Sequence, residues 1–329
     1  DSLPRVIFVD GLGVFGVGES LEKANIVSEL AETFAAVALK SESLGFYAPA
    51  SLRDIFDIEY WGPETAKLAE IKNSPLSGHV VVITGGGSGI GAAAATRFKE
   101  AGAEVVIMDS DRKTTSALAD NLGAMYLWTD VTDKNSLRLA FDQVVQEYGG
   151  LDIVISNAGA AWEGEIGTVP EKILRQSFEI NFFAHQNVSQ AAVEIMKKQN
   201  IIGKVGGVIL FNLSKQAINP GRNFGPYGLP KAATMFLLKQ YALDHGKDGI
   251  RVAGVNADRI RSGLLTDKLI AKRAKARGLS AVDYVTGNLL GREVLAEDVA
   301  KAFLDLALSK STTGAVITVD GGNIEASLR

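Results

Sequence analysis

The feature that most constrains the fold is a regular alternation of short apolar runs and helix-period segments, which begins near residue 79. The apolar runs are rich in Val and Ile and show little polar alternation, as strands covered on both faces do. The candidate strands span 79–84, 104–109, 124–128, 152–156, 207–212, 251–256 and 315–319, and the candidate helices span 90–101, 113–122, 136–148, 171–199, 226–245 and 297–308. This order predicts an α/β fold: a doubly wound, Rossmann-type parallel sheet of seven strands with helices on both faces.

The first 75 residues follow a different pattern. We predict a strand at 5–9, a long helix at 19–43, an irregular stretch at 48–60, and a short helix and a linker between Pro63 and Pro75. One strand and one or two helices are too few for a self-sufficient core, so this segment must pack on the main domain, on another subunit or on further polypeptide. We therefore divide the chain into a small N-terminal α/β extension at 1–75 and a complete Rossmann-fold domain at 76–329.

The composition excludes several classes of function. Of the 329 residues, 47% are hydrophobic and 22% are charged, and the net charge of −4 gives no reason to expect nucleic acid or an anionic membrane as a partner. No apolar run approaches the ~18 residues that span a bilayer, and the N-terminus lacks the features of a secretory signal. The absence of Cys rules out disulfides and thiolate chemistry, so we expect a cytoplasmic protein. The chain starts with Asp1 rather than Met, which indicates processing or a fragment of a longer protein.

Two glycine-rich signatures compete for the role of phosphate-binding loop. Residues 11–16, GLGVFG, match the pattern GxGxxG, but no second strand ending in an acid follows, and apolar Val14 and Phe15 would face the pyrophosphate. We interpret this segment as a structural turn. The second signature, GGGSGIG at 85–91, follows an apolar strand and opens a helix, as dinucleotide-binding loops do. Glycine lets the backbone approach the phosphates, and the helix N-terminus offers free N–H groups and positive potential.

The strand after this loop ends in Asp109, whose carboxylate can accept hydrogen bonds from the ribose hydroxyls of the adenosine. A 2′-phosphate would meet a like charge there, so the sequence favours NAD over NADP. Arg112 is close enough in the sequence to keep NADP as the alternative. Alone, Asp109 is equally explained as a strand-end cap; the glycine loop before it favours the ribose ligand.

Tyr227 and Lys231 lie four residues apart at the start of a predicted helix, and Ser214 precedes Tyr227 by thirteen residues. Residues one helical turn apart share a face, so the phenol and the ammonium can meet. A Tyr loses its proton near pH ~10, and an adjacent ammonium lowers that pKa by favouring the phenolate. A Tyr with a lowered pKa can act as a general base near neutrality. By itself such a Tyr-Lys pair more often lies on an exposed helix surface. Its position in the sequence after the glycine loop favours a catalytic role.

From about Leu76 to Asn323 the chain resembles the short-chain dehydrogenase/reductase family. The resemblance rests on TGGGSGIG, Asp109, Asp130-Val131, Asn157-Ala158-Gly159, Asn181, Ser214, Tyr227 with Lys231, and VDGG at 319–322. It implies an NAD(P)-dependent oxidoreductase that acts on CH–OH groups. The Pro-Gly pair that usually follows the sixth strand is absent at 256–262, which leaves the shape of that loop open.

The resemblance implies a role for each matching residue. Ser214 would hydrogen-bond the substrate oxygen, Tyr227 would transfer the proton, and Lys231 would bind the nicotinamide ribose and tune the Tyr pKa. Asn181 would hold a helix distortion and a water that links Lys231 to solvent. The Asn-Ala-Gly turn would support the cofactor-binding part of the sheet, Asp130 and Val131 would flank the adenine, and Ile260 and Ser262 would approach the nicotinamide amide. The implied cofactor contacts are Gly85, Ser88, Gly89, Ile90, Gly91, Asp109, Asp130, Val131, Asn157, Ala158, Gly159, Tyr227, Lys231, Ile260 and Ser262.

A narrower resemblance covers the whole chain. The stretches RVIFVDGLGVFGVGES, DIEYWGPETAKL and GVNADRIRSGLLTDKLI are similar to bacterial fusions of a class II aldolase with a short-chain dehydrogenase, a group that includes rhamnulose-phosphate aldolase/alcohol dehydrogenases. This implies that residues 1–75 are the end of the aldolase half. The metal of that half needs a histidine cluster, whereas His79, His185 and His245 are scattered, and we expect them to serve packing or the surface. We therefore predict no metal site and no aldolase activity. The fusion context implies an aldehyde or hydroxy-carbonyl from carbohydrate breakdown as substrate, lactaldehyde being one candidate.

Further segments bear on the substrate and on assembly. Residues 267–277 carry five basic side chains, which form either a solvated helix face or a mobile lid whose Arg259 or Arg261 meets an anionic or polyhydroxy substrate. The resemblance implies a homodimer or homotetramer formed through 181–197 and the Tyr227 helix. Candidates for shaping the substrate pocket are Trp162, Gln216 and Phe224, which fall in loops after the strands.

The leading functional hypothesis is an NAD-dependent alcohol dehydrogenase or aldehyde reductase for a small sugar-derived substrate. One alternative is a catalytically silent NAD-binding module that senses redox state or scaffolds an aldolase assembly. The intact set of Asn181, Ser214, Tyr227 and Lys231 argues against it, because a silent module has no need of a proton relay. Another alternative is a lyase or epimerase that uses bound NAD transiently.

Overall fold

The structure, a computed structural model, describes residues 4–62, 74–201, 203 and 206–323. The chain divides into two compact units, Asp1–Gly78 and His79–Arg329. Among the described residues, none of the helices combines the length and the apolar content that a bilayer crossing would need.

The first unit begins with an antiparallel hairpin of β1 (Val6–Val9) and β2 (Gly13–Gly16). The turn of the hairpin contains Gly11 at a φ of 74°, and the Leu12 amide donates to the Val9 carbonyl at 3.1 Å. Residues 11–16 therefore form a tight turn and a strand, as the interpretation of this signature as a structural turn required. The strand β2 was not expected from the sequence.

Two helices follow the hairpin, α1 (Leu21–Leu44) and α2 (Leu52–Glu59). The long helix α1 confirms the prediction at 19–43, within two residues at its start and one at its end. The irregular stretch predicted at 48–60 is wrong in part, because the Ser51 hydroxyl caps α2 by accepting from the Asp54 amide. The short helix and linker predicted between Pro63 and Pro75 fall almost entirely outside the described residues.

The second unit is built on a parallel sheet of seven strands, in the order β5-β4-β3-β6-β7-β8-β9. The strand order reverses between β3 and β6, so their carboxyl ends border the crevice at which doubly wound sheets bind ligands. The predicted sheet is confirmed, with each strand boundary within one residue of its expected position. The strands are β3 (Val80–Thr84), β4 (Glu104–Asp109), β5 (Met125–Trp128), β6 (Ile153–Ser156), β7 (Gly207–Asn212), β8 (Ile250–Ala257) and β9 (Val316–Val319).

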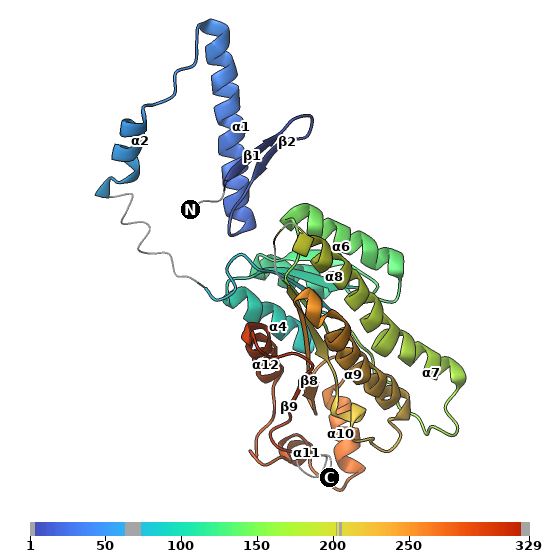
Figure 1. Cartoon of the computed structure of the whole chain (residues 1–329). Helices are drawn as coiled ribbons and strands as arrows, with labels where there is room; N and C mark the ends of the chain where they lie inside the picture. Colours follow the sequence, from blue (N-terminus) through green and yellow to red (C-terminus); the bar gives the residue numbers. More distant parts are fainter. Residues whose placement is uncertain (1–3, 63–73, 202, 204–205, 324–329) are drawn as a thin grey trace. The chain divides into compact units, whose positions relative to one another are not determined.

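Helices cover both faces of this sheet. Figure 1 shows α4 and α12 on one side of it and α6, α8 and α9 on the other. Alternate strand residues such as Val82, Val154 and Phe211 form one continuous core with Phe141 of α6 and Leu238 of α9. The helices are α4 (Gly89–Glu100), α5 (Arg112–Leu122), α6 (Lys134–Tyr148), α7 (Glu171–Phe178), α8 (Ala184–Ile201), α9 (Gly225–His245), α10 (Asp267–Lys275), α11 (Ala281–Thr286) and α12 (Ala296–Leu308).

The segment predicted as one helix at 171–199 is interrupted. A π-helical turn, Glu179–Phe183, joins α7 to α8 and contains Asn181. Such turns are rare and are frequently found at functional sites. The helix distortion that the family resemblance implied at Asn181 is therefore present.

Candidate active site

The glycine loop joins the end of β3 to the start of α4. Gly85 and Gly89 have φ angles of 62° and 52°, a region that favours glycine. A Cβ at Gly85 would lie 2.8 Å from the Ala158 Cα, and one at Gly89 would lie 2.9 Å from the Ser262 Cβ. The Ser88 side chain makes no capping hydrogen bond to α4, so it does not occupy the first N–H groups of this helix, which is the arrangement that an anion at a helix N-terminus requires.

A hollow of about 310 Å³, here called the cofactor hollow, lies at the carboxyl ends of the central strands. Gly91 lies outside its lining, because it packs where an added Cβ would be 2.7 Å from the Asn157 amide nitrogen. The lining residues that the sequence did not single out include Ser110, Thr129, Ile180, Asn212 and Leu264. The expected cofactor residues that do line it are Gly85, Ser88, Gly89, Ile90, Asp109, Asp130, Val131, Asn157, Ala158, Gly159 and Ser262.

Asp109 is held firmly at the edge of the cofactor hollow. Its carboxylate accepts from the Gly87 amide and from the Asp111 amide, both at 2.9 Å. Because Asp109 is tied to the glycine loop, its charge is presented where a ribose next to the phosphates would lie. The carboxylate therefore fixes the glycine loop to the end of β4.

Asn157 connects the glycine loop to the neighbouring strands. Its Nδ2 donates to the carbonyls of Thr84 and Gly85, at 3.0 and 2.9 Å, and its Oδ1 accepts from Asn212 Nδ2 at 2.8 Å. The Asn-Ala-Gly turn thus supports this part of the sheet, as the resemblance implied. Within the described residues Asn212 Oδ1 is a buried acceptor without a partner, and Asn212 lines the hollow. The N–H groups at the start of α4, the carboxylate of Asp109 and the Oδ1 of Asn212 together fit a dinucleotide.

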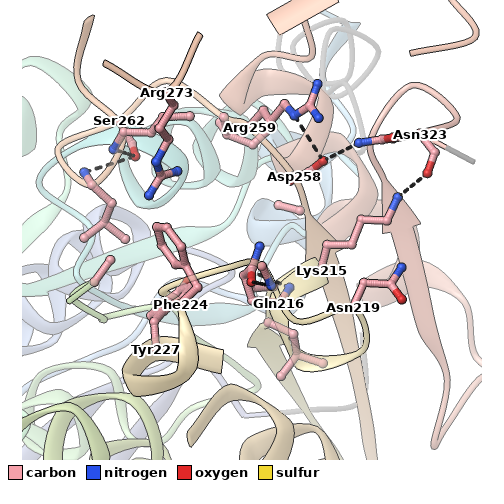
Figure 2. Close-up of a pocket in the computed structure, with 18 of the residues that line it drawn as sticks. Lys215, Gln216, Asn219, Phe224, Tyr227, Asp258, Arg259, Ser262, Arg273 and Asn323 are labelled. Atoms are coloured by element: carbon pink, nitrogen blue, oxygen red, sulfur yellow. Dashed lines mark hydrogen bonds and ion pairs between the residues drawn. The ribbon is translucent and has the colours of Figure 1, made fainter. Parts of the chain in front are cut away.

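A second hollow of about 440 Å³, here called the substrate hollow, lies beside Tyr227 (Figure 2). Gln216 and Phe224 line it as expected, but Trp162 does not. The expected residues Ser214, Tyr227 and Ile260 also line it. The two hollows share four wall residues, Ile90, Asn212, Ser262 and Leu264, so they adjoin.

Tyr227 and Ser214 both line the substrate hollow. Burial raises the pKa of Tyr227, while the hydroxyl of Ser214 and the charge of Arg273 act on this pKa in the opposite direction. The expectation that Lys231 lowers the pKa of Tyr227 is not met in this structure. The Lys231 Nζ lies 5.9 Å from the centre of the Tyr227 ring and donates instead to the Asn212 carbonyl at 2.8 Å.

Lys231 is 2% exposed and lies against a histidine. Its Nζ is 3.4 Å from His185 Nε2, and the Nδ1 of the same ring is 2.6 Å from Ser156 Oγ. Burial lowers the pKa of Lys231 to about 7. Burial, and after it the charge of Lys231, hold the pKa of His185 well below its usual value.

These pKa shifts decide which protons the ring of His185 carries. An ammonium is only a donor, so while Lys231 is charged the Nε2 of neutral His185 must accept. Its Nδ1 then carries the proton and donates to Ser156. The prediction that His185 serves packing is correct as to burial, since the residue is 1% exposed, but the contact with Lys231 was missed.

Asn181 is fully buried and joins the π-helical turn to the other elements of the site. Its Nδ2 donates to the Ala160 carbonyl at 2.7 Å and to Ser177 Oγ at 3.1 Å. Its own carbonyl accepts from Thr234 Oγ1 of α9 at 2.5 Å. The π-helical turn is thereby fastened to the helix that carries Tyr227 and Lys231.

Lys215 forms a buried ion pair with Asp320 and donates to the Asn323 carbonyl at 2.6 Å. The contact fastens the segment VDGG after β9 to the loop that carries Ser214. Because Lys215 and Asp320 are 105 residues apart in the sequence, no local pattern predicts their pairing.

Two protein families match the sequence. The family described as Enoyl-(Acyl carrier protein) reductase matches residues 85–323, and the second domain of class II aldolases matches residues 1–68. The uncharacterized oxidoreductase YuxG of Bacillus subtilis is 31% identical over 98% of this chain, but the match covers 48% of YuxG, so the chain spans about half of its length. The 7alpha-hydroxysteroid dehydrogenase of Escherichia coli is 30% identical over 77% of this chain and 97% of that protein.

Solved structures agree with the sequence matches. A 3-ketoacyl-(acyl-carrier-protein) reductase from Brucella melitensis, in complex with NADH, has a TM-score of 0.67 at 25% identity and covers 74% of this chain and 98% of its own. A 7α-hydroxysteroid dehydrogenase, in complex with NADH and 7-oxo glycochenodeoxycholic acid, has a TM-score of 0.67 at 30% identity. The match covers 76% of this chain and 96% of that dehydrogenase. With the aldolase match at the N-terminus, these findings agree with the dehydrogenase half of an aldolase fusion, and the chain belongs to the short-chain dehydrogenase/reductase family of oxidoreductases.

Proposed function

We propose that the protein is an NAD-dependent dehydrogenase that interconverts a small sugar-derived alcohol or hydroxy-aldehyde and its carbonyl. The observation that carries this proposal is that Ser214 and Tyr227 line one wall of the substrate hollow, and that this hollow shares four lining residues with the cofactor hollow. A substrate oxygen that contacts both hydroxyl groups would therefore lie in a hollow that adjoins the cofactor hollow.

Each residue of the proposed relay has a task. Tyr227 takes the proton of the substrate hydroxyl, and Ser214 hydrogen-bonds the same oxygen. Burial raises the pKa of Tyr227, and the positive charges of Arg273 and of an oxidised nicotinamide would lower it toward the phenolate. The carbinol carbon loses a hydride, for which a bound nicotinamide is the acceptor, as the carbonyl forms. Lys231, with a pKa of about 7, exchanges protons near neutrality, and Asn181 holds the π-helical turn beside it.

NAD is the proposed cofactor because Asp109 is fixed at the edge of the cofactor hollow by two backbone amides. A carboxylate at this place disfavours the 2′-phosphate of NADP. Two structural neighbours bind NADH, which supports a nicotinamide cofactor here.

The test is NADH formation with NAD, and separately NADPH formation with NADP, over a panel of short polyols, 2-hydroxy aldehydes and lactaldehyde. Tyr227→Phe is assayed alongside, with NAD affinity measured by titration calorimetry. We expect turnover with NAD that falls by roughly 10²- to 10⁴-fold in the variant while NAD binding is kept. NAD binding without turnover of any substrate would instead favour the silent NAD-binding or scaffold module.

We further propose that residues 1–75 are the end of an aldolase domain and that the protein is a cytoplasmic homodimer or homotetramer. One feature supports assembly: α9 exposes Leu229, Phe236 and Leu243, each seven residues apart, with Phe236 69% exposed. Residues spaced by seven share a face of a helix, and an exposed apolar stripe of this kind marks an interaction surface.

A further inference from the structure

Among the residues that the structure describes, the substrate hollow is lined by four cationic side chains and one carboxylate, that of Asp258. Lys215 is neutralised by Asp320 outside the hollow. Arg259 lies 3.7 Å from Asp258 and donates to the Tyr284 carbonyl at 2.7 Å, which uses its charge and one donor. The other two cations are Arg273 and Arg277, which lie four residues apart around the end of α10. Arg273 pairs with Glu163 at 3.2 Å, but Glu163 also pairs with Lys272, so one carboxylate is shared by two cations.

Arg273 is fixed beside Tyr227. Its guanidinium carbon lies 4.1 Å from the centre of the Phe224 ring, and that ring meets the Tyr227 ring edge-on at 6.4 Å (Figure 2). Its Nε and Nη2 donate to Glu163 at 3.3 and 3.2 Å. Glu163 is not part of the lining, so it holds Arg273 from outside the hollow.

Arg273 still has a donor to offer. The structure gives its Nη1 no acceptor among the described residues, and the Arg273 charge acts on the pKa of Tyr227. Glu163 is shared with Lys272, so it offsets only part of the positive charge, and the Arg273 side chain keeps an N–H donor near the reacting hydroxyl.

Arg277 adds a second positive charge. Its guanidinium lies 5.3 Å from the centre of the Tyr284 ring, and its Nη1 donates to the Arg273 carbonyl at 3.3 Å. Within the described part of the chain it has no carboxylate at ion-pair distance. Ile270 and Ala274 of α10 are buried in a small cluster with Leu265, Tyr284 and Val285, which anchors the helix that bears Arg273 and the turn after it that bears Arg277.

Not every basic side chain near α10 lines the substrate hollow. Lys272 is 71% exposed in its side chain and pairs with Glu163, yet it does not line the hollow. Arg261 pairs with Asp267 and Glu293 and also stays outside the lining. Arg261 therefore does not reach the substrate hollow in this structure, and the lid hypothesis stays a prediction. Helix α10 is solvated on one face and faces the substrate hollow on the other.

We propose that the substrate carries an anionic group, a carboxylate or a phosphate, which Arg273 and Arg277 bind while its hydroxyl reaches Tyr227 and Ser214. This rests on the proposed dehydrogenase function and adds the substrate class to it. A guanidinium offers several N–H donors in a planar fork that matches both oxyanions. The guanidinium groups of Arg273 and Arg277 line the same hollow and repel each other, and an anion bound between them would reduce this repulsion.

The test compares matched substrates that differ in the anionic group. With NAD and the full chain, kcat/KM is measured for lactate against 1,2-propanediol and for glycerol 3-phosphate against glycerol. We expect kcat/KM to be higher for one or both anionic substrates than for their neutral partners. The pair that shows the difference identifies the anionic group as a carboxylate or a phosphate. Arg273→Gln and Arg277→Gln should each reduce this preference by about 10- to 100-fold, mainly through KM. Lys272→Gln, on the same helix and bonded to the same Glu163, should leave it unchanged.

Anion binding is also measured without turnover, so that the two proposals can fail separately. Oxalate and inorganic phosphate are titrated calorimetrically into the NADH-loaded protein and its Arg273→Gln variant. Binding that is lost in the variant supports the anion site even if no alcohol is oxidised, which would count against the dehydrogenase alone. The inference would be overturned if the anionic and neutral members of both pairs had equal kcat/KM. It would also be overturned if Arg273→Gln lowered kcat/KM by the same factor for anionic and neutral substrates. Absence of oxalate and phosphate binding would do so too.

Discussion

The Nζ of Lys231 lies 3.4 Å from the Nε2 of His185, inside the core of the second unit. The ring of His185 is in turn 2.6 Å from the hydroxyl of Ser156. The lysine at the centre of the candidate relay therefore has two buried acceptors, a backbone carbonyl and an imidazole, and no buried carboxylate among its described hydrogen-bond partners.

Replacing His185 with Phe should alter the ionisation of Lys231. Phe keeps an aromatic ring in the core but removes the acceptor, so the charged form of Lys231 loses one hydrogen bond and its pKa falls below the present value of about 7. We expect kcat/KM to decrease about tenfold and the ionisation near pH ~7 in its pH profile to move to lower pH. The measurement is kcat/KM against pH for the free enzyme.

His185→Gln is the matched control, because its amide oxygen can take the place of Nε2 as acceptor. It should recover most of the activity and return the ionisation toward its original pH. If His185→Phe reduced thermal stability but left the pH profile in place, His185 would be a packing residue only.

Lys231→Met should make the protein more stable while abolishing turnover. Burial lowers the pKa of Lys231 from 10.5 to about 7, so between these values the unfolded chain binds more protons and stability rises with pH. Below pH 7 the folded state bears the full cost of the buried ammonium. The free energy of unfolding of the variant should exceed that of the parent by up to roughly 4 kcal/mol at pH 7 and below. This difference should disappear toward pH ~10.

Urea unfolding at a series of pH values from 6 to about 10 measures this difference. Lys239→Met, an exposed site on the same helix, is the control and should give a small difference that does not vary with pH. A Lys231→Met variant that is less stable than the parent at pH 7 would show that the bonds of Lys231 to Asn212 and His185 outweigh the cost of burial.

Asp109→Ser should shift cofactor preference from NAD toward NADP. The substitution removes the fixed negative charge at the edge of the cofactor hollow and leaves a hydroxyl that a 2′-phosphate tolerates. We expect the ratio of the NADP and NAD dissociation constants to change by about 10- to 100-fold in favour of NADP. Because the 2′-phosphate is the same in the oxidised and reduced forms, titration with NADH and NADPH, followed by fluorescence, measures the same change as the ratio of their dissociation constants.

Asp111→Ser is the control for Asp109→Ser, since Asp111 caps α5 and does not line the hollow. Its cofactor ratio should stay at the parent value. An unchanged ratio in Asp109→Ser would place the adenosine ribose elsewhere.

Phe236→Arg should disrupt the proposed assembly. The side chain is 69% exposed at the centre of the apolar stripe on α9, so a charge there leaves the isolated chain folded but opposes burial between subunits. We expect the parent to sediment as a dimer or tetramer and the variant as a smaller species. Lys239→Met serves again as the matched change on α9, and a parent that sediments as a monomer would contradict the proposal.

Most of the second unit could be predicted because its signals are local. A strand such as Val80–Thr84 is an uninterrupted apolar run, and the glycine loop that follows has an almost unique use at a helix start. Asp109, Ser214 and Tyr227 stand at strand ends or helix starts, where the topology brings them together without any detail of packing.

The parts that were missed depend on contacts between distant segments. His185 is a single histidine within a helical pattern, and nothing near it in sequence indicates Ser156 or Lys231. Arg273 looks like the other basic residues of α10 until its position against Phe224 is known. The lowered pKa expected for Tyr227 failed for the same reason, because burial is set by the whole fold while helical spacing is local. In the first unit, α2 was missed because aromatic residues and a nearby proline obscured its short helical period.

The shared walls of the two hollows bear on the kinetics of the proposed enzyme. Ile90, Asn212, Ser262 and Leu264 each face both hollows, so a ligand in one of them rests on side chains that the other ligand also needs. Under the proposed function, the two ligands should not bind as independent partners. We expect compulsory order, with the dinucleotide first on and last off, and product inhibition that is competitive only between its oxidised and reduced forms.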